Sequence, residues 1–336
     1  IEDNYEECLR NEWTLEDYHR RVANFVVKNN ILRESPETLE LIVWKWIMRE
    51  FFDRGSNSLE SMGYLKFLPN YNTLIDPEIL FRFEPIIKLG LDEEESKRFA
   101  TYLIDQFRLY KAIEFPEAVD PLDDFFAPNN RLGGFCRVSP GTGARTQKGH
   151  TILAWKPSEH YINSRYDFIK KISDRKGLSY DREKILEVLD ILYEIFANQD
   201  SPLTHKVKHS MTPNHGLVQR LDYKLFKVVP GIGNEEIKHY KCNRCYNTTT
   251  INVSGVCPTY NCTGTLGEID LEEKLRDNHY RDIYSNLKLE KMDVSEHTAQ
   301  LTSEYAAEVQ GKFVKGDINV LSCSTTFELG VDVGEL

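Results

Sequence analysis

Four cysteines in the last third of the chain have the spacing of a metal site. Cys242 and Cys245 are separated by two residues, and Cys257 and Cys262 by four. Two short cysteine turns joined by a strand-forming hairpin can deliver four thiolates to a tetrahedral Zn²⁺ ion. Four thiolates leave no open position for water, so we expect a structural zinc ion in a zinc ribbon. An iron–sulfur cluster is the minor alternative, because four thiolates bind both.

A second group of residues, near the end of the chain, has the chemistry of a phosphate site. We expect a short strand ending at His297, a helix capped by Thr302 and running to Phe313, and a strand over 318–323. Such a unit normally closes as a parallel crossover, and ligands gather at the carboxyl ends of its strands. Cys323, on an apolar strand, is expected to be buried. The hydroxyl groups expected at the strand end belong to Ser324, Thr325 and Thr326.

Basic residues concentrate between Ser201 and Cys245. This segment holds eight Lys or Arg against three acidic residues, whereas the whole chain has a net charge of −11. A basic island in an acidic chain is typical of a local phosphate-binding face, with a solvated surface as the equally weighted alternative. The candidate contacts with nucleic acid are Lys206, Lys208, Arg220, Lys224 and Lys227.

Capping residues and apolar periodicity predict a largely helical first half. Thr14 with Asp17, Ser35 before Pro36, and Asp92 with Glu95 mark three helix starts. The predicted helices cover 15–29, 36–54, 92–112, 159–175 and 182–197. Residues 116–157 are rich in Pro, Gly and Asn, which predicts an irregular, strand-poor connection.

The segment 217–229 alternates apolar and polar residues on both sides of a turn at Asp222–Lys224. This pattern predicts a basic β-hairpin. The helix pair over 159–197 followed by such a hairpin resembles a winged-helix module, which we expect to occupy residues 158–235.

The bulk composition narrows the class of protein. No apolar run approaches the roughly 20 residues that span a bilayer, and the N-terminal residues lack the basic start and apolar core of a secretory signal. Seven cysteines with one tight cluster suit a reducing compartment. We therefore expect a cytoplasmic protein, bacterial or archaeal, without a membrane partner. The missing initiator Met favours an excised segment.

The C-terminal segment resembles the second RecA-like domain of superfamily 2 helicases. His297 matches the His that opens the short loop before the "F…G…vLvaT" stretch, and Ser324 falls where these enzymes have the Thr of motif V. Gly330 and Asp332 match the Gly-x-Asp that closes the motif, whereas Thr298 stands where most members have Gly. The resemblance implies that Gly330 and Asp332 couple nucleic-acid contacts to the bound nucleotide. The implied nucleic-acid contacts are His297, Thr298, Ser324, Thr325 and Thr326.

The closer resemblance is to large DEAD/DEAH-type helicases with a C-terminal DUF1998 domain, such as DNA-repair helicases and the helicase of the DISARM antiphage system. These proteins have, in this order, a four-Cys segment, Asn-His-Tyr-Arg (here 278–281), Glu-His-Thr-Ala-Gln (296–300) and Ser-Thr-Thr-Phe-Glu-Leu-Gly-Val-Asp (324–332). The match covers about residues 238–336 well, and residues 1–235 correspond loosely to a helical insertion within the second RecA domain.

The combined prediction is an α+β multi-domain fold. Its parts are a helical insertion (1–115), the irregular connection (116–157), a winged-helix-like module (158–235), the zinc ribbon (236–268) and part of a RecA-like α/β domain (269–336). The segment Pro140–Thr146 lacks the Gly-Lys-Ser/Thr of a Walker A motif, and the chain has no DEAD/DEAH box. We therefore expect the parent helicase, not this chain alone, to bind and hydrolyse ATP with Mg²⁺.

The resemblance also implies the partners. They are DNA, as a single strand or a duplex with a single-stranded end, with RNA as the alternative, the remainder of the helicase chain, and a repair- or defence-system protein. The rival hypothesis is a non-enzymatic module in which the ribbon and the basic hairpin bind nucleic acid or a protein. A degenerate RecA lobe kept as a scaffold is the third possibility.

Overall fold

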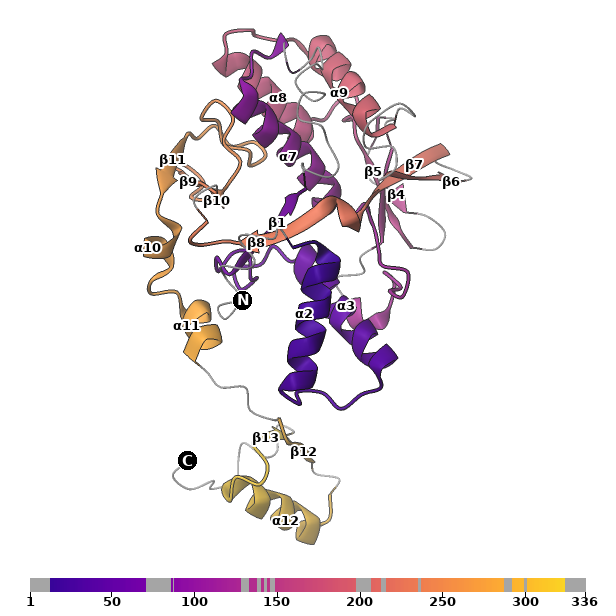
Figure 1. Cartoon of the computed structure of the whole chain (residues 1–336), viewed down its shortest axis with the longest axis vertical. Helices are drawn as coiled ribbons and strands as arrows, with labels where there is room; N and C mark the ends of the chain where they lie inside the picture. Colours follow the sequence, from indigo (N-terminus) through magenta and orange to yellow (C-terminus); the bar gives the residue numbers. More distant parts are fainter. Residues whose placement is uncertain are drawn as a thin grey trace. The chain divides into compact units, whose positions relative to one another are not determined.

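The computed structural model describes residues 13–70, 86, 88–127, 133–137, 140–141, 144–145, 149–197, 207–212, 216–234, 237–286, 292–298 and 301–323. The chain forms two compact units, Ile1–Arg281 and Asp282–Leu336. Both contain helices and strands, which confirms the α+β class (Figure 1).

The five predicted helices are present in the first unit. Thr14 and Asp92 each close a capping box with the carboxylate three residues later, and Ser35 caps the helix that begins with Pro36. One start differs, because the side chain of Asn163 accepts a hydrogen bond from the Tyr166 amide and begins its helix later than expected. The helices are α2 (Leu15–Lys28), α3 (Pro36–Phe52), α7 (Glu93–Leu109), α8 (Ser164–Arg175) and α9 (Arg182–Ala197).

Three strands of a six-stranded sheet lie in the region where an irregular connection was predicted. The strands of the sheet are β2 (Ile113–Glu114), β3 (Gly134–Arg137), β4 (Ala144–Arg145), β5 (Thr151–Ala154), β6 (Val207–Thr212) and β7 (Gly216–Asp222). Three of them, β3, β4 and β5, lie within 116–157, so the prediction of a strand-poor segment was wrong. These strands are two to four residues long, too short to show a period, and they are defined by pairing with one another: β5 lies between β3 and β4.

The predicted hairpin over 217–229 does not form. The turn is present as a short 3-10 helix, η4 (Tyr223–Leu225), between β7 and β8 (Phe226–Pro230). However, β7 pairs with β6, while β8 pairs antiparallel with β1 (Leu65–Pro69) (Figure 1). Strand alternation identifies strands but not their partners, and here the two strands pair with β6 and β1 rather than with each other. The hairpin is β6–β7, which still follows the helix pair α8–α9.

The core of the first unit is aromatic and contains a buried ion pair. Phe51, Phe107, Phe168 and Trp155 are at most 1% exposed. The Arg108 guanidinium is also buried, contacts the carboxylate of Glu60, and donates from Nε to the Phe51 carbonyl at 2.6 Å. A buried charge is tolerated when it is paired or fully hydrogen-bonded, and here the ion pair and the Phe51 carbonyl satisfy the guanidinium.

The zinc-ribbon region forms a three-stranded antiparallel sheet in the order β10–β9–β11. The strands are β9 (His239–Cys242), β10 (Thr248–Thr249) and β11 (Leu266–Ile269). The helices α10 (Leu271–Leu275) and α11 (His279–Asn286) follow it in the sequence.

The second unit contains the strand–helix–strand arrangement predicted from the sequence. It comprises β12 (Val294–His297), α12 (Ser303–Val314) and β13 (Val320–Cys323). The two strands are parallel, Thr302 caps α12, and Gly316 takes φ +78° in the following turn. The expected burial of Cys323 was wrong, because its side chain is exposed on a strand whose one described partner is β12.

Candidate metal centre

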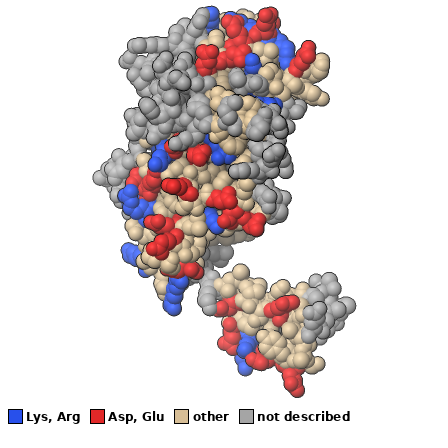
Figure 2. Space-filling view, turned by 90° about the vertical axis from the view of Figure 1, so that its right-hand side faces the viewer, with Lys and Arg blue, Asp and Glu red and all other residues tan. Residues whose placement is uncertain are grey.

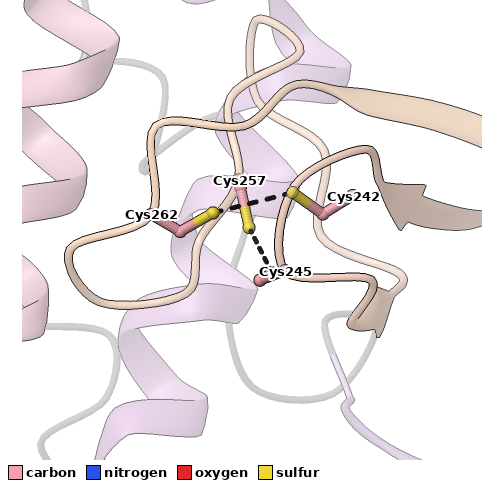
Figure 3. Close-up of side chains that lie close together, drawn as sticks. All are labelled: Cys242, Cys245, Cys257 and Cys262. Atoms are coloured by element: carbon pink, nitrogen blue, oxygen red, sulfur yellow. Dashed lines mark hydrogen bonds between the residues drawn. The ribbon is translucent and has the colours of Figure 1, made fainter.

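The four predicted cysteines converge on one point. Their sulfur atoms all lie within 4.8 Å of one another, and Figure 3 shows the side chains turned toward a common centre. Cys242 Sγ lies 3.7 Å from Cys262 Sγ, and Cys245 Sγ lies 3.7 Å from Cys257 Sγ. Two sulfurs bound at about 2.3 Å to one tetrahedral zinc ion lie about 3.8 Å apart. The donor set and its spacing therefore fit Zn²⁺.

Backbone amides direct partial positive charge at the thiol groups. The amides of Arg244 and Gly264 donate to the sulfurs of Cys242 and Cys262, each at 3.4 Å. Burial acts to raise the pKa of the Cys242 thiol, but amide donors from Cys245 and Arg244 outweigh it and lower that pKa to about 6. Burial raises the pKa of Cys257. The Cys242 thiol therefore loses its proton more readily, and the thiolate is the form that binds a metal cation.

Gly264 is a site residue that spacing alone did not identify. A Cβ atom built on it would lie 2.3 Å from Cys242 Sγ and 2.8 Å from Arg244 Cβ. No side chain fits at such distances, so the glycine lets the second cysteine turn approach the first. The signal in the sequence was a glycine two residues after the last ligand, but the turn itself does not reveal which sulfur it approaches.

Helix α8 anchors the second cysteine turn. Lys171 Nζ donates to the carbonyl oxygens of Thr259 and Cys262 at 3.0 and 3.1 Å. The same ammonium group pairs with Asp167 at 2.7 Å, and Asp167 also accepts from the Asn261 amide at 3.1 Å. The turn that carries Cys262 is thus held by a charged pair on one helix face.

Helix α7 anchors the hairpin that joins the two cysteine turns. Glu95 accepts from both the amide and the hydroxyl of Ser254, at 2.8 and 2.7 Å, and pairs with Lys176 at 2.7 Å. Val253 and Val256, on either side of that turn, belong to the main hydrophobic core of the first unit. The ribbon is therefore built into the helical body through both polar and apolar contacts.

The predicted nucleic-acid contacts of the basic segment differ in their burial and in their partners within the chain. Arg220 is 9% exposed, donates from Nε to the Gly134 carbonyl at 2.7 Å, and lies over the Phe135 ring at 3.7 Å. Its guanidinium is engaged within the sheet, which corrects the expectation of an exposed phosphate contact. Lys224, in η4, pairs with Glu16 at 3.6 Å, and Lys227 lies on β8.

The distribution of the charged side chains that the structure describes also shows no separate basic face in the view of Figure 2. On the face drawn in Figure 2, the basic side chains of the described residues are interspersed with acidic ones and form no continuous stripe. Lys206 and the side chain of Lys208 lie outside the described residues.

The candidate residues of the C-terminal unit are described only in part. His297, the last residue of β12, pairs in register with Cys323, the last residue of β13. Thr298 follows it, and its carbonyl accepts from the Leu301 amide at 3.1 Å. The remaining candidates, Ser324, Thr325, Thr326, Gly330 and Asp332, lie outside the described residues.

No protein-family model, curated protein or solved structure matches this chain. Among the described residues, no helix has both the length and the apolar character that crossing a bilayer requires.

Proposed function

We propose that this chain is part of an ATP-dependent nucleic-acid helicase or translocase of superfamily 2, with DNA as its expected partner. The observation that carries the proposal is the register of the C-terminal unit. Because β12 and β13 are parallel and His297 pairs with Cys323, both strands end at the same edge. The segment 324–332, with its hydroxyl groups and its Gly-x-Asp, begins directly after that edge. Ligands of parallel sheets bind at this edge.

The resemblance to the motor enzymes assigns a role to each residue of this edge. Backbone and hydroxyl donors of His297, Thr298 and 324–326 hold the nucleic-acid backbone, which such donors suit in any fold. Gly330 and Asp332 couple these nucleic-acid contacts to the bound nucleotide. ATP and Mg²⁺ are bound by the parent protein, because residues 1–336 have neither a Walker A motif nor a DEAD/DEAH box.

The first unit supplies a rigid body for guiding the strand. Zinc, held by four thiolates, has a structural role here, because no coordination position stays open for a substrate. The helix pair α8–α9 is followed in the chain by the hairpin β6–β7, and this order supports a winged-helix-like module as part of the proposal. The remainder of the helicase chain and a repair- or defence-system protein are its further partners.

The test is a nucleic-acid-stimulated ATPase assay on the full-length parent protein. Asp332→Ala is expected to lower the stimulated rate tenfold or more, about 1.4 kcal/mol or more in activation free energy, with the unstimulated rate less affected. Asp317→Ala, in the exposed turn before β13, is the control and should leave both rates unchanged. A parent without stimulated ATPase activity, or equal rates for both variants, would overturn the proposal and favour the non-enzymatic binding module.

A further inference from the structure

An exposed face of the zinc ribbon combines two ammonium groups with an aromatic ring. Lys241, on the central strand β9, is exposed and pairs in register with Thr248 of β10. Lys274 of α10 is also exposed and donates a hydrogen bond from Nζ to the hydroxyl of that same Thr248. Tyr246, in the first cysteine turn, lies 5.5 Å from Lys241 Nζ, measured to the ring centroid. We call Lys241, Tyr246, Thr248 and Lys274 the ribbon face.

The two lysines of the ribbon face have no carboxylate to neutralise them among the described residues. Most other described lysines of the first unit, such as Lys176 and Lys238, pair with a carboxylate within 4.0 Å. Both lysines meet at Thr248, which pairs in register with Lys241 and accepts a hydrogen bond from Lys274, and burial, with the positive charge of Lys241, lowers the pKa of Lys274. Two facing cations without a counter-ion attract an anion from outside the chain.

Tyr246 has an exposed side chain and a backbone conformation that is uncommon for a bulky residue. Its φ is +61°, in the left-handed region where glycine is unstrained and a bulky residue is uncommon. Its side chain is 66% exposed, so the ring is available to a ligand. Residues kept in strained conformations cluster at functional sites, and an exposed ring beside cations is the chemistry of a base-stacking platform.

We propose that the ribbon face binds single-stranded nucleic acid, with one base stacked on Tyr246 and a backbone phosphate between Lys241 and Lys274. An extended strand presents both groups together, whereas a duplex hides its base faces. The inference deepens the proposed function and rests on it for the choice of nucleic acid over an acidic protein.

The test is fluorescence anisotropy of labelled dT20 and U20 oligonucleotides with the whole 336-residue chain loaded with zinc. Tyr246→Gly removes the ring while suiting the left-handed backbone, so it is expected to keep the zinc content and the thermal midpoint. It should weaken binding roughly five- to hundredfold, the usual loss for one stacked base. Tyr246→Phe keeps the ring and should bind like the wild type.

The cation half of the face is tested by the double variant Lys241→Ala/Lys274→Ala. It should weaken binding tenfold or more and flatten the salt dependence, because fewer counterions are released. Lys238→Ala, in the same region but already paired with Glu268, is the matched control and should change binding little. Equal weakening with dT20 and U20 assigns the site to either polynucleotide, and weakening confined to one assigns it to that polynucleotide.

Three outcomes would overturn the inference. They are no binding by the wild type, unchanged binding by both the Tyr246→Gly and double-lysine variants, and displacement of the oligonucleotide by an equal charge of polyglutamate. A parent ATPase that is stimulated by DNA while these oligonucleotides bind elsewhere refutes the ribbon face and leaves the helicase proposal standing. If binding depends on the ribbon face but the parent has no ATPase activity, the helicase proposal is refuted and the ribbon face stands.

Discussion

Gly264 lies closer to a ligand sulfur than any residue with a side chain could. In Gly264→Ala, the new Cβ would be 2.3 Å from Cys242 Sγ, so the two cysteine turns must separate. We expect the zinc affinity to fall tenfold or more, because changing the residues that contact a metal ligand typically lowers metal affinity by that factor. Competition with a chelator, followed by metal analysis, measures it. Gly267→Ala, where a Cβ meets nothing within 4 Å, is the control, and equal affinities for the two variants would show that the close approach is unimportant.

Glu50 makes the stability of the first unit depend on pH. Burial raises the pKa of its carboxyl to about 7 from an ordinary 4.5, while the Leu59 amide donates to it at 2.6 Å. The folded state therefore holds this proton more tightly than the unfolded state. The contribution of Glu50 to stability is full below pH 4.5 and is lost as the pH rises to about 7.

Glu50→Gln imitates the protonated side chain and should remove this dependence. We expect the variant to be more stable than the wild type by about 2 kcal/mol at pH 8 and close to it at pH 5. Urea denaturation at the two pH values measures the difference in the free energy of unfolding. A stability difference that is the same at both pH values would contradict the assignment.

At the scale of elements, the contact between α8 and the second cysteine turn decides how firmly the ribbon is held. Lys171→Ala leaves two carbonyl oxygens and the Asp167 carboxylate without their shared donor. Leaving buried acceptors unpaired costs about 1–3 kcal/mol, and because these acceptors are partly buried the lower part of that range applies. We expect a loss of this size in thermal or chemical unfolding, together with faster amide exchange at 259–262.

The neighbouring lysine provides the control for this contact. Lys170 pairs with Asp174 four residues on along the same helix, and its side chain is 39% exposed. Exposed pairs of this kind contribute about 0.3–0.5 kcal/mol. Lys170→Ala should therefore have little effect, and comparable losses for the two variants would argue against an anchoring role for Lys171.

Local signals predicted the helices well and the sheets poorly. The capping boxes at Thr14 and Asp92 determine helix starts because their hydrogen bonds join residues three apart. The partner of β8 depends instead on Leu65–Pro69, more than 150 residues away in the chain. Strand alternation within 217–229 is satisfied equally by a hairpin and by two separate partners, so the local pattern contains no information that distinguishes them.

At the scale of the whole molecule, the metal centre and the core of the first unit are expected to unfold together. Val253 and Val256 join the ribbon to the main hydrophobic core, and Glu95 and Lys171 join it to α7 and α8. Metal removal should therefore lower the stability of the helices as well as of the ribbon.

Cys245→Ser tests this coupling with all other residues in place. We expect substoichiometric zinc and a thermal midpoint lower by several degrees when the transition is followed by helix circular dichroism. Cys323→Ser, at an exposed position outside the cluster, should keep one zinc per chain and an unchanged midpoint. Unaltered helix unfolding in Cys245→Ser, despite loss of the metal, would show that the ribbon and the helical body are independent.

The sequence by itself determined the four cysteines of the candidate metal centre, the helix starts at Thr14, Ser35 and Asp92, and the strand–helix–strand order of the C-terminal unit. Each of these depends on residues that are near neighbours in the chain, where spacing translates directly into geometry. Tertiary structure alone decided that Arg220 is buried, that Gly264 approaches Cys242, that β8 pairs with β1 and that Tyr246 shares a face with Lys274. These relations join segments through packing, and packing depends on the whole chain rather than on any local period.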